Sequence, residues 1–530
     1  MRGKRGYHAP MATRDASFRD APRAPNATLR RRDLLLAGAG SLALPACAGR
    51  GPVGEPRRAR PPGKTPAWGV QSGDVTSSSG VVWCRADAPG LMAVEWSTSP
   101  RFERAVRVPP FLVGPGTDLV GKAPLVGLPS GQAIHYRVSV DGSPWQRGSF
   151  ATPSEDGRDV VLAWSGDTNG QGWGIDPARG GMPAYASLLA RAPDLFVHCG
   201  DAIYADDPIF PTIELPDGSR WNNVVDPGKT HVAETLEDFR AAHRYPRRSS
   251  EVRAFSAAVP VFSIWDDHEV HNNWFPGQVL DDARYTERRI DTLALEARRA
   301  MLEYAPTLAS ASGPLYRKVA WGPLLDLFLL DGRTFRSPNE PAPPEGALLG
   351  AAQAAWLLDE LARSRAAWKV VACGMPIALV VSEPGKTVPR ANDGWGNDDG
   401  APREREVELA RLLSGLKARR VTNVVWITAD VHYAAAHRMD PARAAFKDFD
   451  PFWELVAGPM HATAFPRKPL DDTFGPEVAW ASADWDTLGS PASGAQHFGL
   501  LRVDGRTRDL VVTFVDARGR DLHRLTLTPS

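Results

Sequence analysis

The chain has 530 residues, 43% of them hydrophobic and 23% charged, and its 62 basic residues balance 62 acidic ones. This composition is typical of an ordinary soluble globular protein, and the length allows two or more domains with a sizeable core. The formal net charge of zero gives no electrostatic support for a nucleic acid or an anionic membrane surface as a partner.

Residues 1–50 are predicted to form a twin-arginine export signal. Arg31 and Arg32 precede two leucines and a mildly apolar run of about 15 residues, too short to span a bilayer. A basic amphipathic helix is the alternative. The segment 44–47 also resembles a lipoprotein processing site, which would leave Cys47 lipidated; cleavage after Ala46 or Ala48 without lipidation is the other option. We therefore expect export through the twin-arginine machinery to the periplasm or the outside of the cell, with a membrane-anchored lipoprotein as one form.

Residues 51–65 are rich in Pro, Gly and Arg and are predicted to be a linker. Short strand-like runs follow within 66–153, separated by turn residues at fairly even spacing. This pattern predicts a small N-terminal β-sandwich of immunoglobulin or fibronectin type. The remaining cysteines, Cys84, Cys199 and Cys373, are odd in number and widely spaced, which argues against a disulfide framework.

In residues 154–530, strand-like runs alternate with helical stretches. Strands are expected at 160–164, 194–199, 259–265, 324–330, 369–373 and 424–428, and helices at 293–304, 351–363 and 403–419. A long polar segment to about residue 258, with one helical patch near 234–244, interrupts this order. The region is predicted to be a sheet-centred α/β body.

Two of these strands end in a carboxylate. Gly166-Asp167 follows one apolar run and Gly200-Asp201 follows the next, with Tyr204 three residues later. Such runs are typical of buried parallel strands, and functional groups gather at the carboxyl ends of these strands. Two carboxylates and a phenol suit hard metal ions that prefer oxygen ligands. The alternative for either Gly-Asp pair alone is a simple turn.

Two further strand ends carry the same types of side chain. Residues 259–265 run into Asp266, Asp267 and His268, and residues 424–428 run into Asp430 and His432. Each segment alone could also be a solvated acidic turn or the capped start of a helix, with no role in a site. Four independent strand ends that all carry Asp or His favour one shared site.

The motifs GDTN, GDAIY, WDDHEVHNNW and ADVH resemble, in order and form, those of the calcineurin-like metallophosphoesterases. They are most similar to the PhoD-like alkaline phosphatase/phosphodiesterases, which are related to the purple acid phosphatases. The resemblance covers roughly residues 66–529 and includes LLDGRTFRS at 329–337. It implies an α/β (α+β) fold, with a metallophosphoesterase β-sandwich body flanked by helices after the small N-terminal β domain.

The resemblance also implies a dinuclear metal centre. Asp201 would bridge the two metals, Asp167, Tyr204 and His432 would complete the first, and Asp267 and Asp430 the second. Asp266 and Asn273 are close enough in sequence to take the place of Asp267. PhoD enzymes proper carry a cysteine where this chain has Asp167, so a site more like that of a purple acid phosphatase is expected. Tyr204 favours Fe³⁺, with Ca²⁺, Mn²⁺, Zn²⁺ or Mg²⁺ as the second ion.

The implied activity is hydrolysis of phosphate esters by a metal-bound hydroxide. His268 would protonate the leaving alkoxide or stabilise the transition state. Arg333 is a candidate bidentate clamp for the phosphate, with a surface or structural arginine as the alternative. The preference for monoesters or diesters stays open.

Two other functions are considered. A catalytically weak, metal-stabilised binding protein of the cell surface would keep the fold without hydrolysis, but the presence of His268 together with all the expected ligands argues against it. A non-metal esterase would need a G-x-S-x-G elbow between a strand and a helix, and the chain has none in that context.

Overall fold

The computed structural model describes residues 67–310, 312–381 and 392–530. The predicted export signal, the linker and Cys47 lie outside these ranges. Within them, none of the helices combines the length and the apolar character needed to cross a membrane.

Residues 70–151 form two antiparallel sheets. One has the strand order β1 (Val70–Gly73), β2 (Ser79–Arg85), β5 (Val120–Val126); the other has the order β4 (Val106–Val113), β3 (Gly90–Ser97), β6 (Ala133–Val140), β7 (Gln146–Ala151). Apolar side chains of both sheets, such as Val82 and Ile134, meet in one buried core, so the region is a small β-sandwich. Strands β1 and β5 were not predicted, because glycine and polar residues interrupt their apolar pattern.

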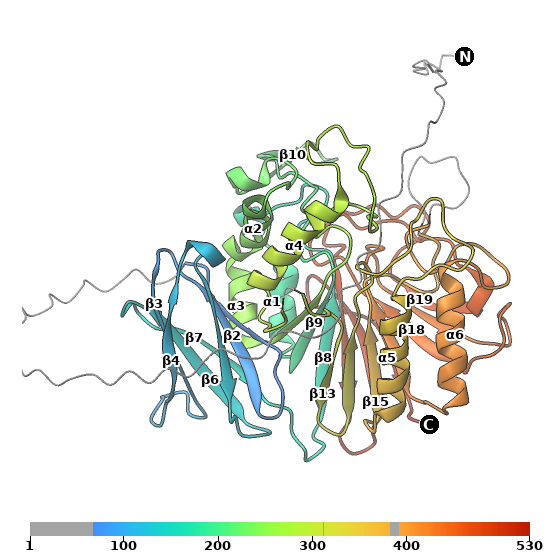
Figure 1. The fold of residues 1–530 in the computed structure, drawn as a ribbon, viewed down its shortest axis with the longest axis horizontal. Helices are drawn as coiled ribbons and strands as arrows, with labels where there is room; N and C mark the ends of the chain where they lie inside the picture. Colours follow the sequence, from blue (N-terminus) through green and yellow to red (C-terminus); the bar gives the residue numbers. More distant parts are fainter. Residues whose placement is uncertain (1–66, 311, 382–391) are drawn as a thin grey trace, which may run out of the picture. The chain divides into compact units, whose positions relative to one another are not determined.

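The rest of the chain is built on two larger sheets. A six-stranded sheet has the order β12 (Val261–Ile264), β9 (Leu195–Cys199), β8 (Val160–Ser165), β20 (His497–Val503), β21 (Leu510–Asp516), β22 (Asp521–Leu527). A seven-stranded sheet has the order β13 (Arg317–Trp321), β14 (Leu325–Leu329), β15 (Trp368–Ala372), β16 (Val424–Thr428), β18 (Phe452–Val456), β17 (Ala435–Met439), β19 (Pro476–Ala481). Leu162 and Val197 of the first sheet share a buried core with Leu327 and Ile427 of the second, which confirms the predicted β-sandwich body (Figure 1).

Helices pack against these sheets. Helices α1 (Pro183–Ala190) and α3 (Ser250–Ala258) share a buried cluster with β9 and β20, whereas α5 (Gly350–Arg363) and α6 (Arg405–Ala418) share one with β15 and β16 (Figure 1). Helices α2 (Leu236–Arg244) and α4 (Ile290–Tyr304) pack together in a third cluster. Helices α4, α5 and α6 correspond to the three predicted helices.

The long segment after Asp201 holds more regular structure than its composition predicts. Besides α2 it contains a small hairpin of β10 (Thr212–Glu214) and β11 (Arg220–Asn222), and helix α3. Helix α3 begins after Ser249, whose hydroxyl accepts a hydrogen bond from the backbone N–H of Val252. Short 3₁₀ turns lie in this segment at η3 (Pro227–Lys229) and η4 (Tyr245–Arg248), and elsewhere in the described chain at η1 (Pro115–Thr117), η2 (Pro177–Arg179) and η5 (Asp472–Phe474).

One buried carboxylate connects the N-terminal strands to two helices. Asp118, just before β5, is paired with Arg85 of β2 at 2.7 Å and with Arg244 of α2 at 2.6 Å, and it accepts a hydrogen bond from the hydroxyl of Tyr304 at the end of α4. Burial raises the pKa of Asp118, but the hydrogen bonds from Arg85, Tyr304 and Arg244 outweigh burial and lower the pKa to about 2. The folded state therefore favours the ionised carboxylate.

We expect Asp118→Asn to lower the free energy of unfolding at pH 7 by about 3 kcal/mol, because three donors lose an ionised partner. In the wild type this contribution is complete above the ordinary carboxyl pKa of about 4 and is lost as the pH falls towards about 2. Urea denaturation of both proteins between pH 7 and pH 3 should show the difference narrowing at acid pH. An unchanged difference at pH 3 would contradict the assigned role.

Candidate metal centre

The carboxyl ends of four strands converge at one place. Strands β8, β9 and β12 are parallel neighbours, so Asp167, Asp201 and Asp267 leave the same edge of one sheet, and Asp430 follows β16 of the other sheet. Ligand atoms lie within 4.8 Å of one another in three groups: Asp167, Asp201 and His432; Asp201, Asp267 and His268; Asp266, Asp267 and Asp430. Because Asp201 and Asp267 each belong to two groups, the three groups form one continuous cluster, called the acidic cluster below.

The backbone is strained where it delivers these side chains. Asp167, Asp201, Asp430 and His432 have φ angles between 54° and 66°, in the left-handed region that residues with a Cβ rarely adopt. Strain of this kind is concentrated at functional sites, where the surrounding structure holds it in place. Gly200, just before Asp201, has a φ of 98°, and a Cβ on it would lie 2.4 Å from the Cβ of Asp266. Glycine therefore lets the ends of β9 and β12 approach each other closely.

His432 presents a neutral nitrogen to the acidic cluster. Its Nδ1 lies 2.5 Å from the backbone carbonyl of Thr463, which only accepts hydrogen bonds, so Nδ1 carries the proton. Nε2 is then unprotonated, and its lone pair accepts a hydrogen bond from the hydroxyl of Tyr204 at 2.8 Å. Burial lowers the pKa of His432 to about 3, which keeps the imidazole neutral. A neutral imidazole whose far nitrogen is held by a carbonyl is the usual form of a histidine ligand.

His268 is held on the edge of the acidic cluster by a carboxylate that sequence reasoning missed. Its Nδ1 lies 2.7 Å from Oδ1 of Asp206, and its ring stacks on the ring of Tyr204 with centroids 4.1 Å apart. The backbone N–H of Asn272 donates to the other oxygen of Asp206. Burial disfavours a charged imidazole, but the carboxylates of Asp206 and Asp267 outweigh burial and hold the pKa of His268 well above its ordinary value. The folded state therefore favours the protonated imidazole of His268 and holds its ring in place.

The surrounding side chains do not supply enough positive charge to compensate the negative charges of the acidic cluster. Burial, and then neighbouring carboxylates, raise the pKa values of Asp167, Asp201 and Asp430 well above the ordinary range. Both side-chain oxygens of Asp167 and Oδ2 of Asp266 are buried without a hydrogen-bond partner among the described residues. Buried charged groups need a compensating charge. Carboxylate oxygens, a phenol and one neutral imidazole are donors that hard cations accept, so the residues present fit the metal ions that the sequence implies.

Asp267 and Asp266 occupy different settings in this cluster. Asp267 belongs to two of the three groups, and its Oδ2 accepts the backbone N–H of Asn273 at 2.7 Å. Asp266 belongs to one group, and its Oδ1 accepts a hydrogen bond from Arg333 at 2.6 Å. Asn273 contributes its backbone, since its N–H bonds to Asp267 and its carbonyl accepts from Asn339.

Arg333 does not have the setting of a phosphate clamp. The side chain is fully buried, and its guanidinium donates to Asp266 through Nε and to both oxygens of Asp393 through Nη1 and Nη2, at 2.6 to 3.0 Å. With these nitrogens bound to carboxylates, Arg333 has no free pair of donors for a substrate. This geometry corrects the expected role and supports the alternative of a structural arginine, which here orients Asp266.

Glu269 is a second residue that sequence reasoning missed. Its carboxylate accepts hydrogen bonds from the backbone N–H groups of Asp201, Ala202 and Asp266, at 2.7 to 3.1 Å. It thereby fixes the chain where it leaves β9 and where it leaves β12. The signal that could have found Glu269 and Asp206 is their place in the motifs, since Glu269 ends the DDHE run and Asp206 follows GDAIY.

Two family models match the chain. The model described as PhoD-like phosphatase matches residues 162–514, and the model described as PhoD-like phosphatase, N-terminal domain, matches residues 54–154. Alkaline phosphatase D of Bacillus subtilis (strain 168) is 27% identical over 398 residues, which make up 70% of this chain and 65% of that relative. The match thus spans just under two thirds of the length of this curated relative.

Solved structures show the same fold. The structure described as that of PhoD aligns with a TM-score of 0.65 at 20% identity, over 89% of this chain and 90% of that one. The purple acid phosphatase PPD1 from yellow lupin (Lupinus luteus) seeds aligns with a TM-score of 0.52 at 11% identity, over 87% and 74% of the two chains. The first family model covers more than half of the sequence and every residue of the acidic cluster, so the chain belongs to the PhoD-like phosphatase family.

Proposed function

We propose that this protein is an exported, metal-dependent hydrolase of phosphate esters that holds two metal ions at the acidic cluster. The observation that carries the proposal is the sharing of Asp201 and Asp267 among three groups of ligand atoms, because a carboxylate that belongs to two such groups can bridge adjacent cations. Family membership, and a relative named alkaline phosphatase D, support phosphate esters as the substrate class.

In this proposal Asp167, Asp201, Tyr204 and His432 would hold the first ion, and Asp201, Asp267 and Asp430 would hold the second. The phenol of Tyr204 favours Fe³⁺ at the first position, and a divalent ion (Ca²⁺, Mn²⁺, Zn²⁺ or Mg²⁺) takes the second. When bound, the two ions would polarise the phosphoryl oxygens and lower the pKa of water towards about 7.

The protein's own contribution to the reaction is proton transfer at His268. Asp206 accepts from Nδ1 of His268 and fixes the ring, so Nε2 is the nitrogen left to donate a proton to the leaving alkoxide. The stacked ring of Tyr204 limits rotation of the imidazole. The side chain of His268 is 14% exposed, so it can meet a substrate that enters from solvent.

We expect His268→Ala to lower kcat by about 10²–10⁴-fold with the metal content unchanged, because the proton donor is lost and the expected ligands remain. Asp206→Asn should lower kcat less and leave KM nearly unchanged, since it loosens the ring and lowers the pKa of His268 but leaves the imidazole present. His271→Ala is the matched control, because His271 lies on the same loop outside the acidic cluster. Steady-state hydrolysis of p-nitrophenyl phosphate and bis-p-nitrophenyl phosphate measures these effects and reports the ester preference. Normal turnover in His268→Ala would remove His268 from the mechanism.

Metal content tests the sharing of Asp201 directly. We expect about two metal ions per wild-type chain, loss of both in Asp201→Asn, and loss of mainly one in Asp430→Asn, because Asp201 would touch both ions. Asp472→Asn is the matched control, since it removes a carboxylate from the separate group of Asp399, Asp471 and Asp472. Inductively coupled plasma mass spectrometry of the purified proteins gives the counts. Equal metal content in Asp201→Asn and the wild type would contradict the proposed centre.

We further propose the chain organisation predicted from sequence: a twin-arginine signal at 1–50, a linker at 51–65, an N-terminal β domain at 66–153 and a catalytic region at 154–530. Arg31 and Arg32 ahead of the leucine-rich run support export to the periplasm or beyond, with Cys47 as the lipid attachment site of an anchored form.

Replacing Arg31 and Arg32 together by lysine should keep the protein in the cytoplasm, because the twin-arginine machinery recognises the arginine pair. Immunoblots of cell fractions measure its location, and Cys47→Ser serves as the companion variant that tests lipidation alone. Unchanged export of the lysine variant would exclude this route.

A further inference from the structure

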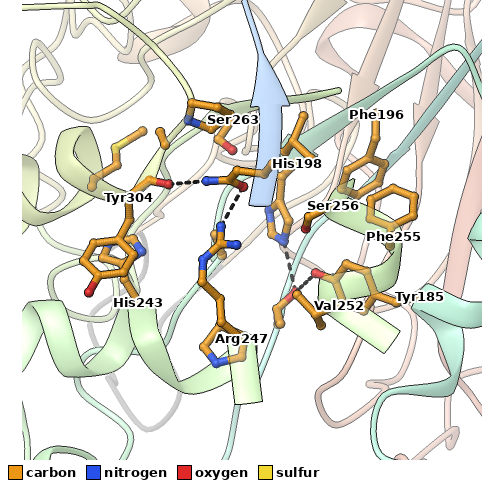
Figure 2. Close-up of a pocket in the computed structure, with 18 of the residues that line it drawn as sticks. Tyr185, Phe196, His198, His243, Arg247, Val252, Phe255, Ser256, Ser263 and Tyr304 are labelled. Atoms are coloured by element: carbon orange, nitrogen blue, oxygen red, sulfur yellow. Dashed lines mark hydrogen bonds between the residues drawn. The ribbon is translucent and has the colours of Figure 1, made fainter. Parts of the chain in front are cut away.

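A cavity with both polar and apolar walls lies next to the loop that carries Asp201. It has a volume of about 90 Å³ and is lined by residues from β1, α1, β9, α2, η4, α3, β12 and the end of α4. Figure 2 shows His243 and Tyr304 on one side of Arg247 and His198 and Tyr185 on the other. Ala202 and Glu269, which adjoin Asp201, also line the cavity.

Arg247 brings a positive charge into this cavity without a carboxylate partner. Its Nη2 donates to Oε1 of Gln71 at 2.6 Å, and its guanidinium lies 4.2 Å above the ring of Trp83. Nη1 is buried and has no hydrogen-bond partner, and within the described part of the chain no carboxylate forms an ion pair with Arg247. Three arginines of the same segment are each paired with an acid: Arg240 with Glu303, Arg244 with Asp118 and Arg248 with Asp226.

The groups that face Arg247 do not balance its charge. Burial lowers the pKa of Arg247 to about 10, which leaves it cationic at neutral pH. Burial also lowers the pKa values of His243 to about 3 and of His198 to about 4, so both rings are neutral there. The carboxylate of Glu269 also lines the cavity, but among the described residues it forms no ion pair with Arg247, and its oxygens accept hydrogen bonds from three backbone N–H groups. Water would solvate the guanidinium but would not neutralise it.

We propose that the cavity binds one small monovalent anion of halide size, held by Nη1 of Arg247 with Nε2 of His243 as a second donor. Nε2 of His243 is buried and has no partner among the described residues, so it is free for this role. One uncompensated guanidinium calls for one negative charge, and the volume suits a halide better than a large organic anion. The anion would lie between Gln71 of β1 and Arg247 of η4 and the part of the cavity lining that contains Ala202. It is separate from the hydrolytic reaction and from its metal ions.

The test uses the purified full chain and bromide as the probe. Apparent Tm is measured as sodium bromide replaces sodium gluconate at constant ionic strength, because gluconate is too large for the cavity. We expect a saturable rise of about 1–3 °C in the wild type, since a ligand that binds only the folded state stabilises it. Arg248→Met, which loses the partly buried ion pair with Asp226 at the neighbouring position, should keep this rise, whereas Arg247→Met should lose it. Anomalous diffraction from bromide-soaked wild-type crystals should place a peak beside Nη1 of Arg247.

Each outcome decides the proposal. No saturable rise in the wild type, or the same rise in Arg247→Met, would overturn the proposal, and an unchanged rise in Arg247→Met would show that bromide binds elsewhere on the protein. An anomalous map without a peak in the cavity would show that only water fills it. If Arg247→Met does not fold, the wild-type map alone decides, because a peak at Arg247 supports the site and its absence rejects it.

Discussion

Mutual repulsion among buried carboxylates is the constraint on which the rest of this structure depends. Asp167, Asp201, Asp266 and Asp430 are held together with Asp267 although burial disfavours the charged forms of the first four. Part of that repulsion is offset within the protein: Arg333 neutralises Asp266, and backbone N–H groups satisfy Glu269. The side-chain oxygens of Asp167 have no hydrogen-bond donor among the described residues. The arrangement thus separates a carboxylate whose charge an arginine compensates from carboxylates whose charges no protein cation compensates, among the described residues.

The sequence allowed the sheets and most of the cluster to be predicted, because both follow from local patterns. Short apolar runs predicted β8, β9, β12 and β16, and aspartates of the acidic cluster follow the carboxyl end of each of these strands. What the sequence could not give was the partner of each charged side chain. Arg333 was expected to face the substrate, since nothing near it in the sequence shows that Asp393, sixty residues later, occupies its guanidinium. Strands β1 and β5 and helix α3 were missed for a related reason, since tertiary packing stabilises them more than their own residue pattern does.

Arginine side chains of α2 and η4 connect the small N-terminal sheets to the region after residue 154. Arg244 reaches Asp118 beside β5, Arg240 reaches Glu303 of α4, and Arg247 reaches Gln71 of β1. Gln71 in turn donates to the backbone carbonyl of Tyr304, so one strand and two helices meet at the same side chains. Since Ala202 and Glu269 line the cavity beside Arg247, the packing of the N-terminal sheet is continuous with the loop that positions Asp201.

The strand order of the six-stranded sheet also sets the time at which the site can assemble. Strand β8, which leads to Asp167, pairs with β9 on one side and with β20 on the other, and the hydroxyl of Ser165 at its end donates to the carbonyl of His497. On the ribosome, β8 keeps an unpaired edge until residues near 500 have emerged, and pairing over such a sequence distance is slow. The sheet edge that leads to Asp167 is therefore completed late, and a nascent chain that stalls before β20 exposes an unpaired strand edge that favours aggregation.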